Sequence, residues 1–151
     1  FAPQSVNRQI RQIQRAWQQL SSELDGPPAD EVLAERVGIP LDRLYRTLEE
    51  ARRLQFLSIH GLAGAGGEAP LAPVDDQPSP LDEASRKETI ARLAQAMMEL
   101  PKRDRMVLIL YYERDLTMKE AAEVLGVTES RVSQMHASAL FKLSMKLGSN
   151  T

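Results

Sequence analysis

Four polar side chains between positions 130 and 134 have the chemistry that binding to a nucleic acid requires. Short hydroxyls, an amide and a guanidinium can form hydrogen bonds with the edges of bases and with phosphates. The four residues are Ser130, Arg131, Ser133 and Gln134. They can act together only if a rigid element presents them on one face, so the surrounding residues decide whether this chemistry is available.

The surrounding sequence predicts such an element, two helices joined by a tight turn. Thr117 is placed to cap the first helix, and Glu120, three residues later, completes a capping box. The alanines at 121–122 let a second helix cross closely, and Gly126 suits the positive φ at which a helix ends. Thr128 then caps the next helix. This order is typical of a helix-turn-helix, whose second helix enters the major groove of DNA.

A rotation of about 100° per residue along the second helix separates an apolar side from a polar one. An ordinary helical hairpin with a polar surface is the alternative, but the caps, the glycine and the polar side together favour the helix-turn-helix. The side expected to pack inward carries Val132, Met135, Ala139, Leu143 and Leu147. The side expected to face outward carries Ser130, Gln134, Ala137 and Phe141, flanked by Arg131, Ser133 and Ser138.

A weaker copy of this pattern lies upstream. Residues 34–44 align without gaps on residues 122–132, and alanine, glutamate, glycine and arginine coincide. Pro40 replaces the capping threonine, however, and Leu41 and Asp42 replace polar residues of the downstream copy. We therefore expect the upstream copy to share the helix-turn-helix core and to pack without reading bases.

Apolar residues recur at spacings of three and four on both sides of a central stretch, without any alternation of period two. The sequence thus predicts an all-α fold of two small helical domains, residues 1–57 and 85–151. Residues 58–84, rich in proline and glycine, are interpreted as a linker. The expected stripes are Ile10, Ile13, Trp17, Leu20 and Leu24; Val32, Leu33 and Val37; Leu44, Leu48 and Arg52; Ile90, Leu93, Ala94 and Met97; and Met106 with Leu110.

The charge distribution differs among these three segments. The 151-residue chain has a net charge of −2, but residues 58–84 hold five acidic and no basic side chains. Residues 85–151 carry 11 basic and eight acidic side chains, whereas residues 1–57 are balanced. An acidic linker therefore masks a basic C-terminal domain, which is the charge that binding to nucleic acid favours. Taken alone, however, charges of this size are more typical of an ordinary solvated surface.

Composition excludes several classes of site. The lack of cysteine excludes disulfides and thiolate metal sites, and only two histidines are present, so a histidine-rich metal site is excluded as well. No apolar run is long enough to span a membrane, and no signal peptide is recognisable. We therefore expect a cytoplasmic protein without cofactor or metal. The chain begins at Phe1, so we expect it to be part of a longer protein.

Three strings in the C-terminal half form a recognisable set. They are Leu-Pro-Lys-Arg-Asp-Arg at 100–105, Leu-Tyr-Tyr-Glu at 110–113 and Leu-Gly-Val-Thr-Glu-Ser-Arg-Val-Ser-Gln at 125–134. They resemble region 4 of the bacterial RNA polymerase sigma factors, and residues 129–134 are especially similar to the flagellar (sigma-28) type and its sporulation relatives. Residues 3–6, Pro-Gln-Ser-Val, and the helices that follow resemble region 3 of the same type.

The resemblance implies that region 4 recognises the promoter −35 element, with Arg131 and Gln134 as the main contacts and Thr117 on a phosphate. Glu129 and Ser130 stand at positions that differ among sigma classes, so they would help set the preferred sequence. Region 3 would touch DNA just upstream of the −10 element through its first helix. The complete expected DNA-binding set is Thr117, Thr128, Glu129, Ser130, Arg131, Ser133, Gln134, Asn7, Arg8 and Arg11.

The resemblance also implies partners. Core RNA polymerase and promoter DNA are expected, for transcription of motility or sporulation genes, with the linker in the polymerase cleft and RNA exit channel. An anti-sigma factor is expected too, because inhibitors of the flagellar type grip region 4. We expect an exposed surface of Phe141, Leu140 and Met145 to bind it, unless Phe141 packs against a neighbouring helix. Region 2 of the family is expected before Phe1.

Other classes of function stay open at this point. One alternative is a helix-turn-helix transcriptional regulator that does not bind core polymerase, which a pulldown with the polymerase would distinguish. Another is a pure interaction module held by an inhibitor. An enzyme is disfavoured, because the paired carboxylates Asp75 and Asp76 lie in the Pro/Gly-rich stretch, where nothing fixes their positions.

Overall fold

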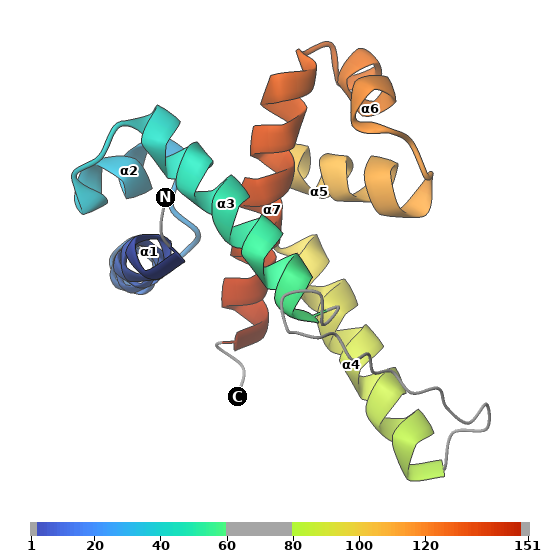
Figure 1. The fold of residues 1–151 in the computed structure, drawn as a ribbon. Coiled ribbons are helices and arrows are strands. Elements are labelled where there is room, and N and C mark those ends of the chain that lie inside the picture. Colours follow the sequence, from blue (N-terminus) through green and yellow to red (C-terminus); the bar gives the residue numbers. More distant parts are fainter. Residues whose placement is uncertain (1–2, 60–79, 149–151) are drawn as a thin grey trace.

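The computed structural model describes residues 3–59 and 80–148, with side chains for 4–53 and 81–148 (Figure 1). Within these ranges the chain forms helices and no strand, which confirms the expected all-α class. None of the helices there is long and apolar enough to cross a membrane. In chain order they are α1 (Pro3–Leu24), α2 (Asp30–Val37), α3 (Leu41–Ile59), α4 (Pro80–Met98), α5 (Lys102–Leu108), the π-helix η1 (Ile109–Glu113), α6 (Met118–Leu125) and α7 (Glu129–Gly148).

The first unit consists of α1, α2 and α3, and α1 packs on both of the others. Its core follows the predicted stripes, because Ile13, Leu33 and Leu44 are at most 1% exposed. Val32 is 38% exposed and lies outside this core, although it belongs to an expected stripe. Leu24 is 54% exposed, so its expected inward position is wrong. It is the last residue of α1, directly before Asp25 leaves the helix at a φ of 61°.

The second unit consists of α4 to α7, with α7 in contact with each of its three α-helical neighbours. The expected helix through Met106 and Leu110 does not stay α-helical, because it ends in η1, where Arg114 N donates to Ile109 O over 3.0 Å. A π-turn adds one residue to the helical turn and so rotates the side chains that follow it.

The start of α4 differs from expectation in two ways. The helix begins at Pro80, inside the stretch 58–84 interpreted as a linker, of which residues 60–79 lie outside the described residues. Ile90 and Leu93 are 56% and 39% exposed, so the stripe through them is not buried. Periodicity shows that a helix has an apolar side, but burial requires a neighbour, and only the last turns of α4, around Ala96, pack into the second unit.

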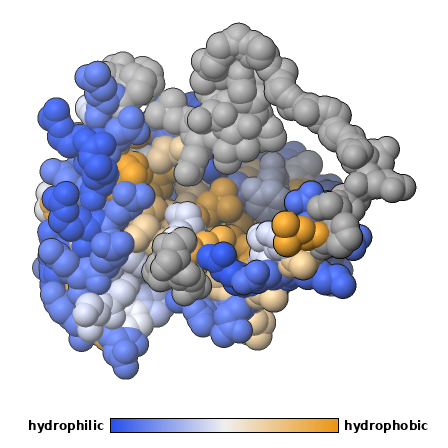
Figure 2. All heavy atoms as spheres, turned by 90° about the horizontal axis from the view of Figure 1, so that it is seen from below, coloured by the Kyte–Doolittle hydropathy of each residue, from blue (hydrophilic) through white to orange (hydrophobic). Residues whose placement is uncertain are grey.

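The two units pack against each other along α3 and α7, which cross in the middle of the molecule (Figure 1). One apolar cluster continues from Trp17 and Leu48 of the first unit to Ala137, Phe141 and Met145 of the second. Seen from below, polar side chains cover the side formed by α1, and apolar ones gather in the middle of the face (Figure 2). Helix α7 is therefore buried on two sides, by its own unit and by the first.

Candidate nucleic-acid interface

The helix-turn-helix predicted from the sequence is present in α6 and α7. Thr117 Oγ1 accepts a hydrogen bond from Glu120 N (3.0 Å) and Thr117 N donates to Glu120 Oε1 (2.9 Å), which is the expected capping box. Gly126 ends α6 at a φ of 72°. Thr128 Oγ1 then accepts from Arg131 N over 3.0 Å and caps α7. All three local predictions are confirmed.

The inward side of α7 also agrees with the rotation argument. Val132 and Ala139 are fully buried and Met135 is 4% exposed. Ala121 and Ala122 of α6 pack with Val132 in one cluster, and their small side chains allow the close crossing of α6 and α7. The orientation of α7 in its own unit is therefore fixed by packing.

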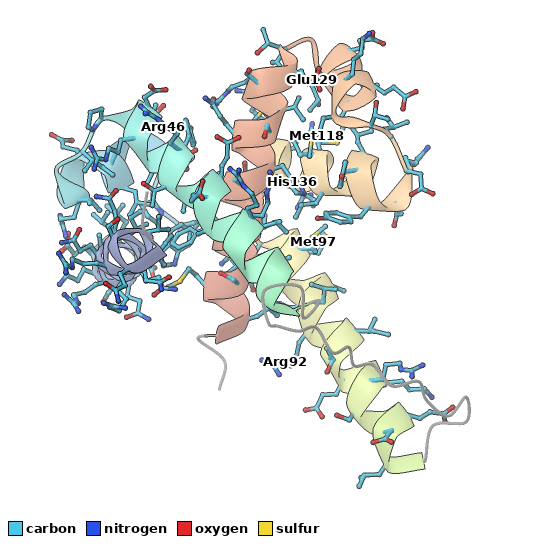
Figure 3. All side chains as sticks on the ribbon, viewed as in Figure 1. Arg46, Arg92, Met97, Met118, Glu129 and His136 are labelled. Atoms are coloured by element: carbon cyan, nitrogen blue, oxygen red, sulfur yellow. The ribbon has the colours of Figure 1, made fainter. Side chains whose placement is uncertain are left out.

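The side of α7 expected to contact DNA, which carries residues 128–134 of the expected set, is called its reading side. Only the start of this side is exposed. Thr128, Glu129 and Ser130 are exposed, and so is Thr117 at the start of α6. Figure 3 shows Glu129 at the end of α7 that projects away from α3. Carboxylate and hydroxyl groups at this end can reach a partner without any change in the protein.

Arg131, the residue directly after Ser130, is held by the first unit. Its guanidinium carbon lies 5.3 Å from the centre of the Tyr45 ring, and its Nη1 donates to Gln134 Oε1 over 3.4 Å. A cation at this distance over an aromatic face is attracted to it. Burial raises the pKa of Tyr45 to about 12, so the phenol stays neutral beside the guanidinium.

Ser133, the next residue of the expected DNA-binding set, also contacts the first unit. Ser133 Oγ donates to Glu49 Oε2 of α3 over 2.7 Å. Ser133 and Gln134 are both half-buried. Helix α3 thus covers the reading side of α7 from Arg131 onward, and it leaves open only the start of α7, up to Ser130.

His136 joins the two units at the crossing of α3 and α7 (Figure 3). Arg52 donates to its Nδ1, so the ring proton of the neutral histidine is on Nε2, which donates to Tyr112 Oη over 2.9 Å. Burial, and secondarily the charge of Arg52, lower the pKa of His136 to about 4. The imidazole is therefore neutral at physiological pH and accepts from the guanidinium.

A buried ion cluster forms a second link between the units. Lys142 Nζ lies 2.6 Å from Asp104 Oδ2 in its own unit and 3.0 Å from Asp30 Oδ1 of α2. Asp30 also accepts hydrogen bonds from Tyr45 Oη (2.7 Å) and Ser138 Oγ (3.2 Å). Burial alone would lower the pKa of Lys142, but the two carboxylates outweigh it and raise the pKa, so the amine stays charged.

The expected exposure of Phe141 is wrong, because its side chain is only 9% exposed. Its ring meets Trp17 of α1 edge to face, with 5.7 Å between the ring centres. Rotation along α7 placed Phe141 outside its own unit correctly, but the first unit covers that side. Met145 is buried in the same cluster, whereas Leu140 packs with Leu100 and Leu108 in another, so the three do not form one surface. Ala137 and Ser138, expected outward, are also buried.

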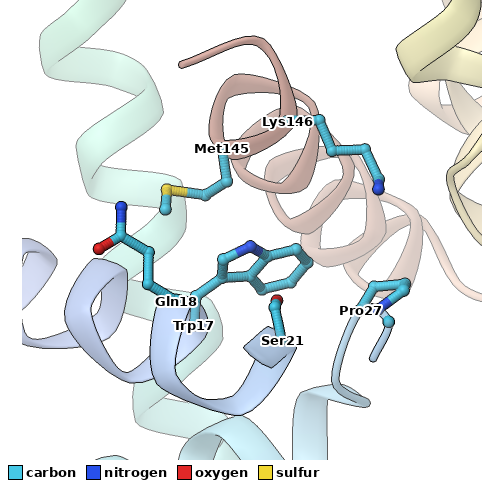
Figure 4. Close-up of a pocket in the computed structure, with 7 residues that line it drawn as sticks. Trp17, Gln18, Ser21, Pro27, Met145 and Lys146 are labelled. Carbon is cyan, nitrogen blue, oxygen red and sulfur yellow. The ribbon is translucent and has the colours of Figure 1, made fainter. Parts of the chain in front are cut away.

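A pocket of about 260 Å³ lies at the seam between the units, beside Trp17. Figure 4 shows Trp17, Gln18 and Ser21 of α1 on one side and Met145 and Lys146 of α7 on the other. Gln18 of the first unit and Lys146 of the second thus line the same pocket, away from the first turn of α7.

The expected region 3 contacts, Asn7, Arg8 and Arg11, are exposed on α1. Arg8 lies on a different surface from the reading side of α7, because it lines a groove between α1 and α3 on the far face of α3. Sequence reasoning missed two other residues of this groove, Arg43 and Arg46. The upstream alignment contained the signal, since it places Arg43 opposite Arg131. In the described ranges, acidic and histidine side chains form no group that could hold a metal ion.

Family comparisons match both units. Residues 8–62 match the family described as Sigma-70 region 3, and residues 96–144 match Sigma-70, region 4. The chain is 34% identical over 150 residues to the RNA polymerase sigma factor FliA of Salmonella typhimurium. This match covers 98% of this chain and 63% of FliA. It is 27% identical over 147 residues to the sigma-D factor of Bacillus subtilis, with 95% and 58% covered.

The chain therefore spans about three fifths of the length of the curated relatives it matches. Among solved structures, it is similar to a flagellar sigma/anti-sigma complex, Sigma-28/FlgM, at 25% identity and a TM-score of 0.44. That match covers 97% of this chain and 62% of the other.

Proposed function

The chain belongs to the sigma-70 family, of which it contains regions 3 and 4, and we propose that its second unit recognises the −35 element of promoters as part of a flagellar-type sigma factor. The observation that carries this proposal is the capped first turn of α7, with Glu129 and Ser130 exposed. A fixed helix end with short polar side chains is what entry into the major groove requires.

Within this proposal the residues have separate roles. Arg131 and Gln134 contact base edges, and Ser133 and the two capping hydroxyls of Thr117 and Thr128 contact base edges or phosphates. Asn7, Arg8 and Arg11 of α1 contact DNA upstream of the −10 element. The action is binding and positioning for core RNA polymerase in the cytoplasm, without a catalytic step.

We infer further that the arrangement of the two units is a resting form. Tyr45 and Glu49 of α3 occupy the guanidinium of Arg131 and the hydroxyl of Ser133, so these groups are unavailable to DNA. Promoter reading then requires α7 to leave α3. An anti-sigma factor is the third proposed partner, and it reaches Phe141 and Met145 only after the same separation.

A crosslink across the seam tests this function. The chain has no cysteine, so Gln18→Cys with Lys146→Cys can be joined by a short bis-maleimide without touching any reading residue. Fluorescence anisotropy is measured with a duplex carrying a −35 element of a flagellar promoter and with a scrambled duplex. The free double variant is expected to prefer the −35 duplex about tenfold, and the crosslinked one to lose that preference.

Each outcome is decisive for one part of the proposal. If the free variant shows no preference, α7 does not read this element. A preference that survives crosslinking means that the arrangement is not a resting form. Gln134→Ala should relax the preference at one or two base pairs by about 1–3 kcal/mol, whereas an equal loss for all sequences would assign Gln134 to a phosphate.

Binding to core polymerase distinguishes the alternative, a helix-turn-helix regulator that acts without it. Affinity-tagged chain, incubated with purified core RNA polymerase, is expected to retain the polymerase on the resin. A chain that binds the −35 duplex but retains no polymerase would support the alternative.

A further inference from the structure

The far face of α3, opposite α7, forms a basic groove with α1. Residues on one side of an α-helix recur every three to four positions. On α3, the residues Tyr45, Glu49 and Arg52 all point toward α7. Arg43, Arg46 and Thr47 occupy the opposite side and line, with Arg8 and Gln12 of α1, a groove of about 580 Å³. The groove is therefore open although the reading side of α7 is covered.

The arginines of this groove are poorly neutralised. Among the described residues, Arg8 and Arg43 have no acidic partner, and Arg43 makes only a long hydrogen bond of 3.5 Å to Gln9 Oε1. Arg46 pairs with Asp42 at 3.4 Å, but the two side chains are 74% and 75% exposed. Exposed pairs of this kind contribute little, so Arg46 can exchange its partner readily.

One acidic side chain does line the groove. Glu50 has its carboxylate 3.1 Å from Arg53, which offsets its charge. Gln9 is oriented by Thr47, whose Oγ1 donates to Gln9 Oε1 over 2.9 Å. Because that oxygen is occupied, the amide N–H groups of Gln9 are the atoms left to bind an acceptor.

The arginines continue beyond the groove along α1. Arg8, Arg11 and Arg15 share one exposed side of this helix over roughly 10 Å, and the only acidic residue of α1 is Glu23 near its end. An extended strip of guanidinium groups fits a ligand with repeated negative charges better than a single small anion. Guanidinium forks bind phosphate oxygens in pairs.

The internal alignment adds an independent argument. With the same offset that places Gly38 on Gly126, Arg43 and Arg46 fall on Arg131 and Gln134, the expected base-reading positions. In the upstream copy, α1 stands beside these positions, so the helix cannot enter a groove of DNA as α7 does. Its arginines can still reach the phosphates that border one.

We propose that the α1–α3 groove, through Arg43 and Arg46 with Arg8, binds the phosphate backbone of duplex DNA while α7 is still covered by α3. The proposal rests on the function argued above and adds an order of events to it. The chain first holds DNA through phosphates without sequence preference, and α7 reads the sequence after the units separate.

The test uses the crosslinked Gln18→Cys/Lys146→Cys chain, in which α7 stays covered, and a scrambled duplex at salt concentrations from 50 to 200 mM. Arg43→Gln and Arg46→Gln are each expected to weaken binding about three- to tenfold at 50 mM salt and to reduce the salt slope by about 1. Arg36→Gln is the matched control, because Arg36 lies on α2 of the same unit but pairs with Glu23 of α1 at 2.8 Å. It should bind like the parent.

Unchanged binding of both groove variants, or an equal loss for Arg36→Gln, overturns the proposal. Tighter binding of a single-stranded RNA of equal length, lost in the same variants, overturns it in favour of an RNA site. Preference for the −35 duplex in the uncrosslinked chain is a separate readout, so failure of the groove is distinguishable from failure of the proposed promoter reading.

Discussion

In both helix-turn-helix copies an eight-residue helix ends at a glycine in the left-handed region, Gly38 at a φ of 89° and Gly126 at 72°. A longer helix follows, α3 in the first unit and α7 in the second. The copies differ in their caps, since Thr117 closes a capping box whereas Ala29, at the aligned position, makes no side-chain bond. They differ also in which side of the second helix is covered.

The difference in covering is reciprocal, because α3 and α7 cover each other. The side of α3 that carries Tyr45 packs against α7, whereas the side that carries Arg43 is open. The side of α7 that carries Arg131 packs against α3, so only the start of α7, up to Ser130, is exposed. Similar local sequences thus build similar backbones. What each copy can bind depends on the neighbour that occupies its surface.

The largest expected effects come from the two fully buried residues at aligned positions, Leu44 and Val132. Leu44→Ala should reduce the free energy of unfolding by about 3 kcal/mol and Val132→Ala by about 2 kcal/mol, through lost burial and the cavity left behind. Urea unfolding is followed by the emission of Trp17, the only tryptophan, and by circular dichroism.

The same measurement shows how independent the copies are. If Val132→Ala shifts only the circular dichroism transition and leaves the Trp17 transition in place, the two units unfold separately. A common shift of both signals would mean that the two units unfold as one cooperative unit. The two copies could then not be treated as independent.

The link through His136 predicts a pH dependence of the closed arrangement. Its pKa is lowered to about 4 in the closed form, so the stability it contributes is present above about pH 6.5 and is lost as the pH falls toward 4. The loss is at most about 3 kcal/mol, since protonated His136 would face Arg52, with Tyr111 and Tyr112 as its other neighbours.

Trp17 emission measures this opening, because the indole lies against Phe141 of the second unit. His136→Gln should remove the change between pH 6.5 and 4, and His60→Gln, which alters the other histidine, should keep it. A pH profile that is identical in the parent and in His136→Gln would exclude this role of His136.

Asp30→Asn tests how much the buried ion cluster contributes to holding the two units together. Lys142 keeps Asp104 but loses the charge of its partner in the first unit, so the closed arrangement should lose about 2 kcal/mol. The yield of the Gln18→Cys/Lys146→Cys crosslink should fall. Asp104→Asn, inside the second unit, is the contrasting variant and should lower the stability of that unit. Equal crosslink yields in the parent and Asp30→Asn would contradict the prediction.

The sequence predicts well what depends on neighbouring residues. The capping box of Thr117, the left-handed Gly126 and the inward Val132 each follow from spacing, because a helix end is satisfied by residues within a few positions. The division into two helical units also follows, since helical stripes lie on both sides of the Pro/Gly-rich stretch.

Contacts between the units could not be predicted in this way. Rotation along α7 shows that Phe141 and Ser138 point away from their own unit, but it does not show that Trp17 and Asp30 cover them. For the same reason the stripe through Ile90 was expected to be buried. The sequence shows whether a side of a helix is apolar or polar. Whether a neighbouring helix or solvent covers that side is decided by the tertiary structure.

The smallest expected effect concerns the caps, which can be exchanged between the copies. Thr117→Ala should destabilise the second unit by about 1 kcal/mol, because Glu120 N loses its acceptor. Ala29 has nearly the same backbone, φ −68° and ψ 155° against −72° and 167° at Thr117. A serine there can therefore accept the free N–H group of the first turn of α2.

Ala29→Ser should consequently stabilise the first unit by about 0.5–1 kcal/mol, as measured by the urea midpoint of Trp17 emission. The gain should stay below the loss in Thr117→Ala, because Val32 stands where a capping box needs a glutamate and cannot return the second hydrogen bond. Thr117→Ser is the matched control and should keep nearly full stability. A loss in Ala29→Ser would mean that the two helix starts are not equivalent, and the structural correspondence between the copies would then begin only at Gly38 and Gly126.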